Sequence, residues 1–385
     1  MRLKVALAAA LVVATATGVW VYSRQSPSGI TRNGDRNVLL ITIDTLRADA
    51  LGSYGGRAVT PNLDRLAAAG VRFADGRAHA VVTLPSHASI LSGRYPYEHG
   101  IRDNTGYRFP AATPTLATLL KAQGHATGAF IGGFPLVRQF GLGIGFDTYD
   151  DRLGSATDRT EAERPASAVV QSAQSWIEAQ KGKWFAWVHV YDPHTPYAPP
   201  PEWRARFPSD PYLGEVSAVD AALAPLFDRL AQHGRPTLVV VTADHGEALG
   251  EHGEATHGIF AYESTLRVPM IFGELGARDR AAKGSLPSSP ARHVDILPTV
   301  LDALGAPPSH GSGMSLLGAF RDASDTGADA PSYFEAMTPT LTRGWAPLRG
   351  DSRGGEKYIH FPIPELYDLV DDPGESRNLV DKIPD

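Results

Sequence analysis

The stretch VVTADHGEALGEHGEATHG, residues 240–258, indicates both the fold class and the position of a functional site. Its apolar start is typical of a buried strand, and that strand ends at Asp244 and His245. A carboxylate beside an imidazole is a pair of metal ligands. In open α/β sheets ligands bind at the carboxyl ends of the strands, so we expect a site here. The following loop adds acids and histidines: Glu247, Glu251, His252, Glu254 and His257.

The composition sets the broad class of the protein. The chain has 385 residues, of which 43% are hydrophobic and 20% charged, which is typical of a globular protein with one large domain or a large and a small one. The net charge of -6 argues against a nucleic-acid partner. Because the chain contains no cysteine, disulfides, thiolate metal sites and a cysteine nucleophile are excluded. Any metal must be held by carboxylate, imidazole or hydroxyl groups.

The N-terminal segment predicts export from the cytoplasm. Arg2 and Lys4 precede an apolar run over residues 5–22, and Ala14-Thr15-Ala16 fits a cleavage site. The run is also just long enough to remain as a membrane anchor. We therefore interpret 1–22 as a signal peptide or anchor and 23–36 as a linker, and expect a protein that is periplasmic or anchored facing outside the cytoplasm.

Strand and helix patterns alternate through most of the chain. This alternation predicts an α/β fold, with a mainly parallel sheet covered by helices on both faces over 37–305. After residue 305 the pattern loosens, and 306–385 is expected to form a small subdomain with antiparallel strands. We expect strands at 37–44, 125–131, 183–192, 236–244 and 266–273, and helices at 60–73, 113–124, 164–180, 213–234 and 294–305.

Two early residues are candidates for the other half of the site. Asp44 ends the first strand, where it is either a helix cap or a metal ligand. Thr83 begins the segment TLPSHASILSG, in which an early Pro85 and a final Gly93 fit a short helix. A hydroxyl at that position either caps the helix or faces a phosphate or sulfate, since helix N-termini attract anions.

Taken in order, these motifs resemble the sulfatase branch of the alkaline phosphatase superfamily. The resemblance covers nearly all of the chain from residue 37 onward. The opening strand of that family, with its metal-binding aspartate, has its counterpart in NVLLITIDTLRADALGSYG (37–55), and its first helix in TPNLDRLAAAGVRF (60–73). The nucleophile motif corresponds to TLPSHASILSGRYP (83–96). The second half of the metal site corresponds to TADHGEALGEHG (242–253) with LRVPMIFG (266–273), and the C-terminal end to ELYDLVDDPGESRNLV (365–380).

The resemblance implies roles for individual residues. Asp44, Asp244 and His245 become metal ligands, and Thr83 becomes both nucleophile and ligand. His194 in DPHTPY matches a substrate-binding histidine of the family, and we expect it to be catalytic.

Three further positions are expected to contact the substrate. His257 stands where sulfatases commonly have a lysine and phosphoethanolamine transferases a histidine, so it is a second catalytic candidate. Asn104 matches an asparagine that contacts the anion in related phosphonate and phosphate-ester hydrolases, and His87 replaces the arginine of the nucleophile motif. We assign both to substrate binding. His189 alternates with apolar residues, and we expect it to be a satisfied core residue.

The chain also departs from the family pattern. Sulfatases convert a cysteine or serine to formylglycine, but Thr83 carries a methyl on its β-carbon and cannot yield that aldehyde. Thr45 replaces the usual second metal-binding aspartate, and residues 131–134 lack the family's lysine and histidine. We therefore expect a metal-dependent hydrolase that cleaves a sulfuric or phosphoric ester through Thr83. The alternatives are a phosphodiesterase or phosphoethanolamine-type transferase, and an inactive anion-binding protein of the cell envelope.

The expected cofactor is a divalent metal ion. Carboxylates favour Ca²⁺ or Mg²⁺, whereas the imidazole favours Mn²⁺ or Zn²⁺. A second ion would need other ligands, for which Asp192, His194, His252 and His257 are candidates. The expected substrate is an ester of a small molecule, glycan or lipid, with membrane anchoring through the N-terminal segment as an additional contact.

Overall fold

The computed structural model describes residues 30–154, 162–232, 234–276, 284–320 and 330–382. The predicted signal or anchor segment 1–22 and the first part of the predicted linker 23–36 lie outside these residues. Within the described ranges, no helix combines the length and the apolar character needed to span a membrane.

A seven-stranded sheet forms the centre of the molecule, in the order β2-β9-β7-β1-β6-β4-β5. The pairs within β7-β1-β6-β4-β5 are parallel, whereas β9 and β2 add an antiparallel edge. The apolar runs of β1, β6 and β7 are completely buried, as expected for strands covered on both faces. The strands are β1 (Asn37–Ile43), β2 (Val71–Arg72), β4 (Ala126–Ile131), β5 (Thr148–Asp150), β6 (Trp184–Val190), β7 (Thr237–Ala243) and β9 (Met270–Leu275).

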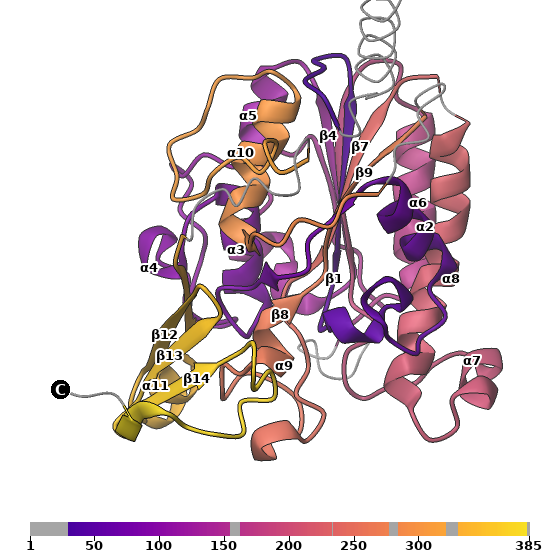
Figure 1. Cartoon of the computed structure of the whole chain (residues 1–385). Helices are drawn as coiled ribbons and strands as arrows, with labels where there is room; N and C mark the ends of the chain where they lie inside the picture. Colours follow the sequence, from indigo (N-terminus) through magenta and orange to yellow (C-terminus); the bar gives the residue numbers. More distant parts are fainter. Residues whose placement is uncertain (1–29, 155–161, 233, 277–283, 321–329, 383–385) are drawn as a thin grey trace, which may run out of the picture.

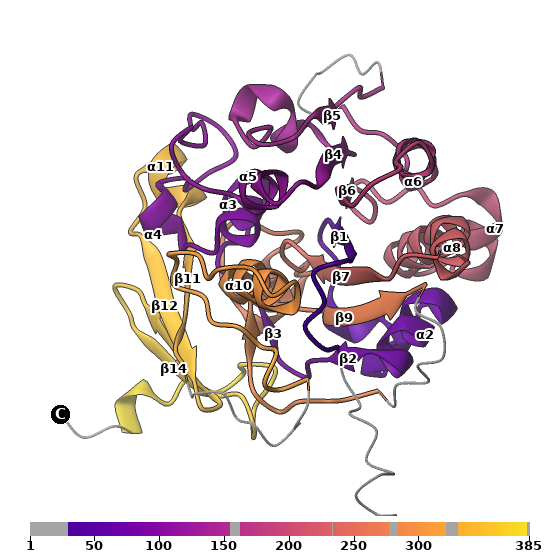
Figure 2. The same ribbon diagram turned by 90° about the horizontal axis from the view of Figure 1, so that it is seen from above.

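Helices cover both faces of this sheet, which confirms the predicted fold class. α3, α5 and α10 lie on one face and α2, α6 and α8 on the other, as Figures 1 and 2 show from two directions. The larger helices are α2 (Pro61–Ala69), α3 (Thr83–Ser92), α5 (Leu116–Ala122), α6 (Ala166–Glu178), α8 (Pro211–Ala231) and α10 (His293–Ala303). The short ones are α4 (Pro96–His99), α7 (Pro201–Arg206), α9 (Glu263–Leu266) and α11 (Thr338–Arg343).

The segment LRVPMIFG differs from its prediction as one strand. It forms two strands in different sheets, because Pro269 has no N–H with which to continue a ladder. β8 (Arg267–Val268) joins β3 (Gly76–Arg77) and β10 (Ala291–Arg292) in a three-stranded sheet. β9 begins after the proline and runs antiparallel to β7.

The predicted C-terminal subdomain is partly continuous with the main core. Four antiparallel strands form its sheet: β11 (Ser332–Ala336), β12 (Leu348–Arg353), β13 (Glu356–His360) and β14 (Glu365–Asp368). In contrast, Leu316, Leu317 and Phe320 pack with Phe73 and Phe272 of the main core. Residues 306–320 therefore belong structurally to the larger domain, and the small sheet begins after residue 330.

A buried ion-pair network fastens the small sheet to the larger domain. Lys357 on β13 is fully buried, with its Nζ atom 2.7 Å from Glu375 and 3.2 Å from Glu263 of α9. Arg77 on β3 also pairs with Glu263. Because an unpaired buried charge is costly, removal of the lysine should loosen this contact.

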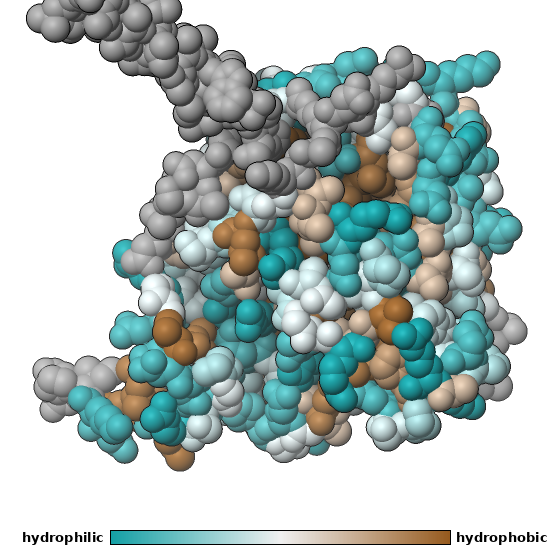
Figure 3. Space-filling model, turned by 45° about the vertical axis from the view of Figure 1, so that its right-hand side comes forward, coloured by the Kyte–Doolittle hydropathy of each residue, from teal (hydrophilic) through white to brown (hydrophobic). Residues whose placement is uncertain are grey.

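The surface is largely polar where it can be viewed in Figure 3. On that face hydrophilic side chains dominate, and the apolar areas are small and separate. The apolar runs of β1, β6 and β7, in contrast, are buried in the central sheet.

Candidate active site

The carboxyl ends of two adjacent strands bring three predicted residues together. Asp44 follows β1, and Asp244 and His245 follow its neighbour β7; all three are completely buried. The Nε2 atom of His245 lies 3.5 Å from Oδ2 of Asp244 and 4.0 Å from Oδ1 of Asp44. Asp44 Oδ1, Asp244 Oδ2 and His245 Nε2 have no hydrogen-bond partner among the described residues. Three unpaired ligand atoms thus face one another.

The electrostatics of this cluster favour a bound cation. Burial, and then the neighbouring Asp244, raise the pKa of Asp44 well above its ordinary value. Burial also opposes ionisation of Asp244, but the imidazoles of His245 and His87 outweigh it and lower the pKa of Asp244. Two buried carboxylates this close do not both ionise readily unless a positive charge lies between them. The unpaired oxygens and nitrogen fit a divalent metal ion.

Thr83 is the first residue of α3 and faces Asp44. Its Oγ1 atom donates to Oδ2 of Asp44 over 3.5 Å. The N-cap of α3 is Val82, so Thr83 is not the capping residue. Pro85 lies in the first turn, and Gly93 ends the helix at a φ of 67°, as the sequence predicts. The hydroxyl therefore lies at the start of a buried helix beside the cluster, where the helix dipole favours an anion.

Asn104 lies next to this helix start. Its Oδ1 atom accepts a hydrogen bond from the backbone N–H of Leu84 over 2.7 Å. This hydrogen bond orients the amide group of Asn104 and engages its oxygen, so that its NH₂ group remains to donate to a bound anion. Asn104 is therefore close enough to the N-terminus of α3 for its predicted contact with an anion.

The contacts of His87 do not fit the substrate-binding role that we expected. Its Nδ1 atom bonds the carbonyl of Thr83 at 2.8 Å, and its Nε2 atom bonds Oγ1 of Thr42 at 2.9 Å. Burial lowers the pKa of His87 to about 3, so the ring is neutral. Nδ1 must donate to the carbonyl, and Nε2 accepts from the Thr42 hydroxyl, which itself accepts from Trp187. Both nitrogens are used to hold the first turn of α3.

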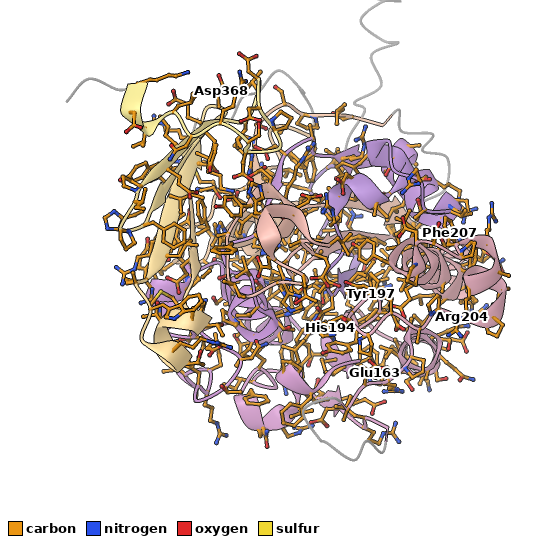
Figure 4. All side chains as sticks on the ribbon, turned by 90° about the horizontal axis from the view of Figure 1, so that it is seen from below. Glu163, His194, Tyr197, Arg204, Phe207 and Asp368 are labelled. Atoms are coloured by element: carbon orange, nitrogen blue, oxygen red, sulfur yellow. The ribbon has the colours of Figure 1, made fainter. Side chains whose placement is uncertain are left out.

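His194 and His257 lie together beside the cluster. Their ring centres are 5.2 Å apart, and the ring of His257 is 4.5 Å from that of His245. Figure 4 labels His194 and Tyr197 near the middle of the face seen from below. Burial, helped for His194 by His257, lowers the pKa of each imidazole to about 4, so both rings are neutral near pH 7. Each is thus available as a hydrogen-bonding or proton-transfer group rather than as a fixed cation.

Glu247 is a residue of this site to which the sequence assigned no role. It is fully buried, and its Oε1 atom lies 3.0 Å from Nδ1 of His257. Its Oε2 atom accepts from the hydroxyl of Tyr197 at 2.8 Å. The carboxylate therefore orients the imidazole and turns Nε2 of His257 away from itself. Only the three-dimensional packing reveals this pair, because a loop glutamate has no distinguishing pattern in the sequence.

The predicted second metal site is not assembled. His252 stacks on the ring of Tyr262 with centres 3.7 Å apart, and Asp192 accepts from the backbone N–H of Ala166. The set of four candidates therefore does not converge. Thr45 supplies no ligand either, because its hydroxyl donates to the carbonyl of Pro193.

Comparison with known proteins supports one family. The model of the Sulfatase family matches residues 36–306 of the chain. The delta 4,5-hexuronate-2-O-sulfatase of Bacteroides thetaiotaomicron is 24% identical, over an alignment that covers 89% of this chain and 84% of that protein.

Solved structures agree with this match. One, in complex with its substrate D-glucosamine-2-N,6-O-disulfate, has a TM-score of 0.77 at 22% identity and covers 90% of this chain and 93% of its own. The phosphonate monoester hydrolase of Agrobacterium radiobacter has a TM-score of 0.75 at 21% identity, with 90% and 92% covered. The chain thus shares its fold with these two solved structures. The chain belongs to the sulfatase family and is an enzyme that hydrolyses ester bonds.

Proposed function

We propose that this enzyme is a metal-dependent hydrolase that forms a covalent ester on Thr83 and acts on singly charged esters. A phosphodiester is the favoured substrate, and a sulfate monoester is the second candidate. The observation that carries the proposal is the hydroxyl of Thr83 at the start of α3, 3.5 Å from Asp44 and outside the capping position. A buried hydroxyl at a helix N-terminus is well placed to attack an anionic centre.

The metal-binding part of the proposal rests on Asp44, Asp244 and His245, which would hold the ion. A divalent ion there supplies positive charge that favours the deprotonated hydroxyl and offsets the charge of the ester. Asp244 is already oriented, since its Oδ1 atom accepts from the backbone N–H groups of Thr45 and His245 at 3.2 and 2.8 Å. Its other oxygen is left for the ion.

The remaining residues bind the ester and move protons. Oγ1 of Thr83 attacks phosphorus or sulfur, while the start of α3 and the NH₂ group of Asn104 bind the non-bridging oxygens. His257 donates Nδ1–H to Glu247, and His194 donates Nδ1–H to the carbonyl of Thr195. Nε2 of His257 is therefore the first candidate for proton transfer, because Nε2 of His194 also lies 3.3 Å from the hydroxyl of Tyr191. When the ester forms, Nε2 of His257 takes the proton of the Thr83 hydroxyl and passes it to the leaving oxygen. It then takes a proton from the water that hydrolyses the Thr83 ester and returns it to Oγ1 of Thr83.

Charge balance supports a singly charged substrate. The charges of the two metal-binding carboxylates and one divalent ion cancel, and Glu247 is a further buried carboxyl group, whereas the imidazoles of His194 and His257 are neutral near pH 7 and add no positive charge. A doubly charged phosphate monoester would place excess negative charge in a buried site. Phosphodiesters and sulfate monoesters carry one charge each.

Two observations bear on whether the substrate is a phosphodiester or a sulfate monoester. The methyl group of Thr83 prevents the formylglycine chemistry of sulfatases, which favours a phosphodiester. The family match and the complex of one structural neighbour with a glucosamine disulfate favour a sulfate ester, which is why we keep it as the second candidate.

A paired assay tests the proposal. Purified enzyme is given 4-nitrophenyl sulfate, bis(4-nitrophenyl) phosphate and 4-nitrophenyl phosphate at equal concentration, with and without a chelator. We expect turnover of the diester to be fastest, the phosphate monoester to be slowest, and the chelator to stop all of them. Turnover that survives the chelator, or a preference for the phosphate monoester, would contradict the proposal. Turnover that depends on an added alcohol acceptor would indicate the transferase alternative, and no turnover with any ester would indicate the anion-binding alternative.

We also propose export of the protein, which is supported by Arg2, Lys4 and the apolar run over 5–22. Fractionation of cells expressing the full chain tests this idea. Recovery in the cytoplasmic fraction with an intact N-terminus would contradict it.

A further inference from the structure

We infer that His189 is an additional ligand of the metal ion, so that the ion has two imidazole and two carboxylate ligands. The inference rests on the proposed metal dependence and deepens it. His189 lies on β6 and is completely buried. Within the described part of the chain, neither of its ring nitrogens has a hydrogen-bond partner. A buried imidazole with two unpaired nitrogens is costly, so our expectation of a satisfied core residue was wrong.

The strand register directs this side chain toward the cluster. His189 on β6 is paired with Thr42 on β1, two residues before Asp44. Successive side chains of a strand alternate between faces, so Thr42 and Asp44 share the face of the sheet to which His189 also points. The Nε2 atom of His189 lies 3.4 Å from Oδ2 of Asp44. The unpaired nitrogen therefore faces a carboxylate that we assign to the ion.

A neighbouring set of residues offers a competing arrangement. Two sets of ligand atoms lie within 4.8 Å of one another: Asp44, Asp244 and His245 form one, and His87, His189 and Asp244 form the other, so that Asp244 is common to both. Binding of an ion by His87 would have to break one of its bonds, to Thr83 or to Thr42, because these occupy both of its nitrogens. His189 has no such bonds to lose. We therefore assign it to the same ion as Asp44, Asp244 and His245.

The added imidazole has a consequence for metal choice. Thr45 directs its hydroxyl to Pro193, so the residue after Asp44 contributes nothing to the ion. His189 provides the missing ligand from a different strand. Two nitrogen ligands shift the preference from Ca²⁺ and Mg²⁺ toward Zn²⁺ or Mn²⁺.

The experiment must show whether His189 binds the metal ion or only donates a hydrogen bond to Asp44. X-ray absorption on the zinc-loaded full-length protein counts the imidazoles bound to zinc. We expect two in the wild type and one in His189→Gln. His125→Gln is the matched control, because His125 is also buried but bonds the carbonyls of Leu120 and Arg36 away from the site. Competition with a chelator should show zinc affinity at least ~10-fold lower for His189→Gln than for the control.

The possible outcomes distinguish the two proposals. One imidazole in the wild type, unchanged in His189→Gln, would overturn this inference and leave the metal-dependent function in place, with His189 acting as a donor to Asp44. Protein that binds no zinc, Mn²⁺ or Ca²⁺ at all would overturn both. A wild-type count of one imidazole overturns the inference even if the variant fails to fold.

Discussion

Replacement of Thr83 by alanine is the most direct test of the proposed chemistry. The change removes the oxygen that is expected to form the covalent ester and leaves Asp44, Asp244, His245 and His189 in place. Loss of a nucleophile in hydrolases of this kind typically costs on the order of 10⁴- to 10⁶-fold in kcat. We therefore expect turnover of the best substrate in the paired assay to fall below detection.

The structure indicates that this loss will not come from unfolding. Thr83 is not the cap of α3, and within the described ranges its hydroxyl makes one hydrogen bond, the 3.5 Å contact with Asp44. Removal of such a weak bond costs on the order of 1 kcal/mol of folding free energy. The backbone carbonyl of Thr83, which holds His87, is unchanged by the substitution. The melting temperature of Thr83→Ala should thus stay within a few degrees of the wild type.

A control on the same helix makes the comparison sharper. Ser86 is one turn further along α3, is also buried, and donates its hydroxyl to the carbonyl of Ala80 at 3.0 Å. Ser86→Ala should keep most of the activity and lose a similar amount of stability. Rapid quenching of the wild type followed by mass spectrometry should locate a covalent adduct on the peptide that contains Thr83. Activity of Thr83→Ala within ten-fold of the wild type, in the absence of contaminating hydrolase, would refute the assignment.

Four further changes test other parts of the structure. A chelator should abolish activity and lower Tm, and Zn²⁺ or Mn²⁺ should restore both better than Ca²⁺; full activity after chelation would rule out metal dependence. Glu247→Gln weakens the bond that orients His257, so kcat should fall about 10- to 100-fold with KM nearly unchanged in steady-state kinetics, and an unchanged kcat would remove that role. Lys357→Met leaves the buried carboxylate of Glu375 without its cation and Glu263 with Arg77 alone, and should cost about 3–5 kcal/mol in denaturant unfolding. Lys121→Met, at a half-exposed pair with Asp147, should cost less than about 1 kcal/mol; equal losses would contradict this account. Burial raises the pKa of Glu215 from 4.5 to about 8. Between these pH values the folded protein holds a proton that the unfolded chain has released, so the folding stability falls as the pH rises through that window. Glu215→Gln should remove this dependence of stability on pH, and an unchanged dependence in thermal melts at several pH values would show that other groups cause it.

Much of the scaffold follows from local sequence patterns. The apolar runs of β1, β6 and β7 identify central strands, because strands buried on both faces have short, nearly continuous apolar segments. Asp44, Asp244 and His245 could be placed at strand ends for the same reason. Thr83 could be placed at a helix start from Pro85 and Gly93. These features depend on neighbours within a few residues, which the sequence shows directly.

Other features depend on pairings between distant parts of the chain. The sequence could not predict that Glu247 would orient His257 or that His87 would use both nitrogens within the protein, since each bond joins side chains through tertiary packing. The split of residues 266–273 into two strands of different sheets also depends on pairing with distant parts of the chain.

The sequence by itself thus determined the sheet, the strand-end acids and the helix-start hydroxyl, because hydrophobic periodicity and turn residues act locally. Only the tertiary structure decided which of the 13 histidines face those acids. His189 shows the physical reason most clearly. Its alternation with apolar residues is that of any buried strand position, whereas the parallel register with β1 sets Nε2 3.4 Å from Asp44.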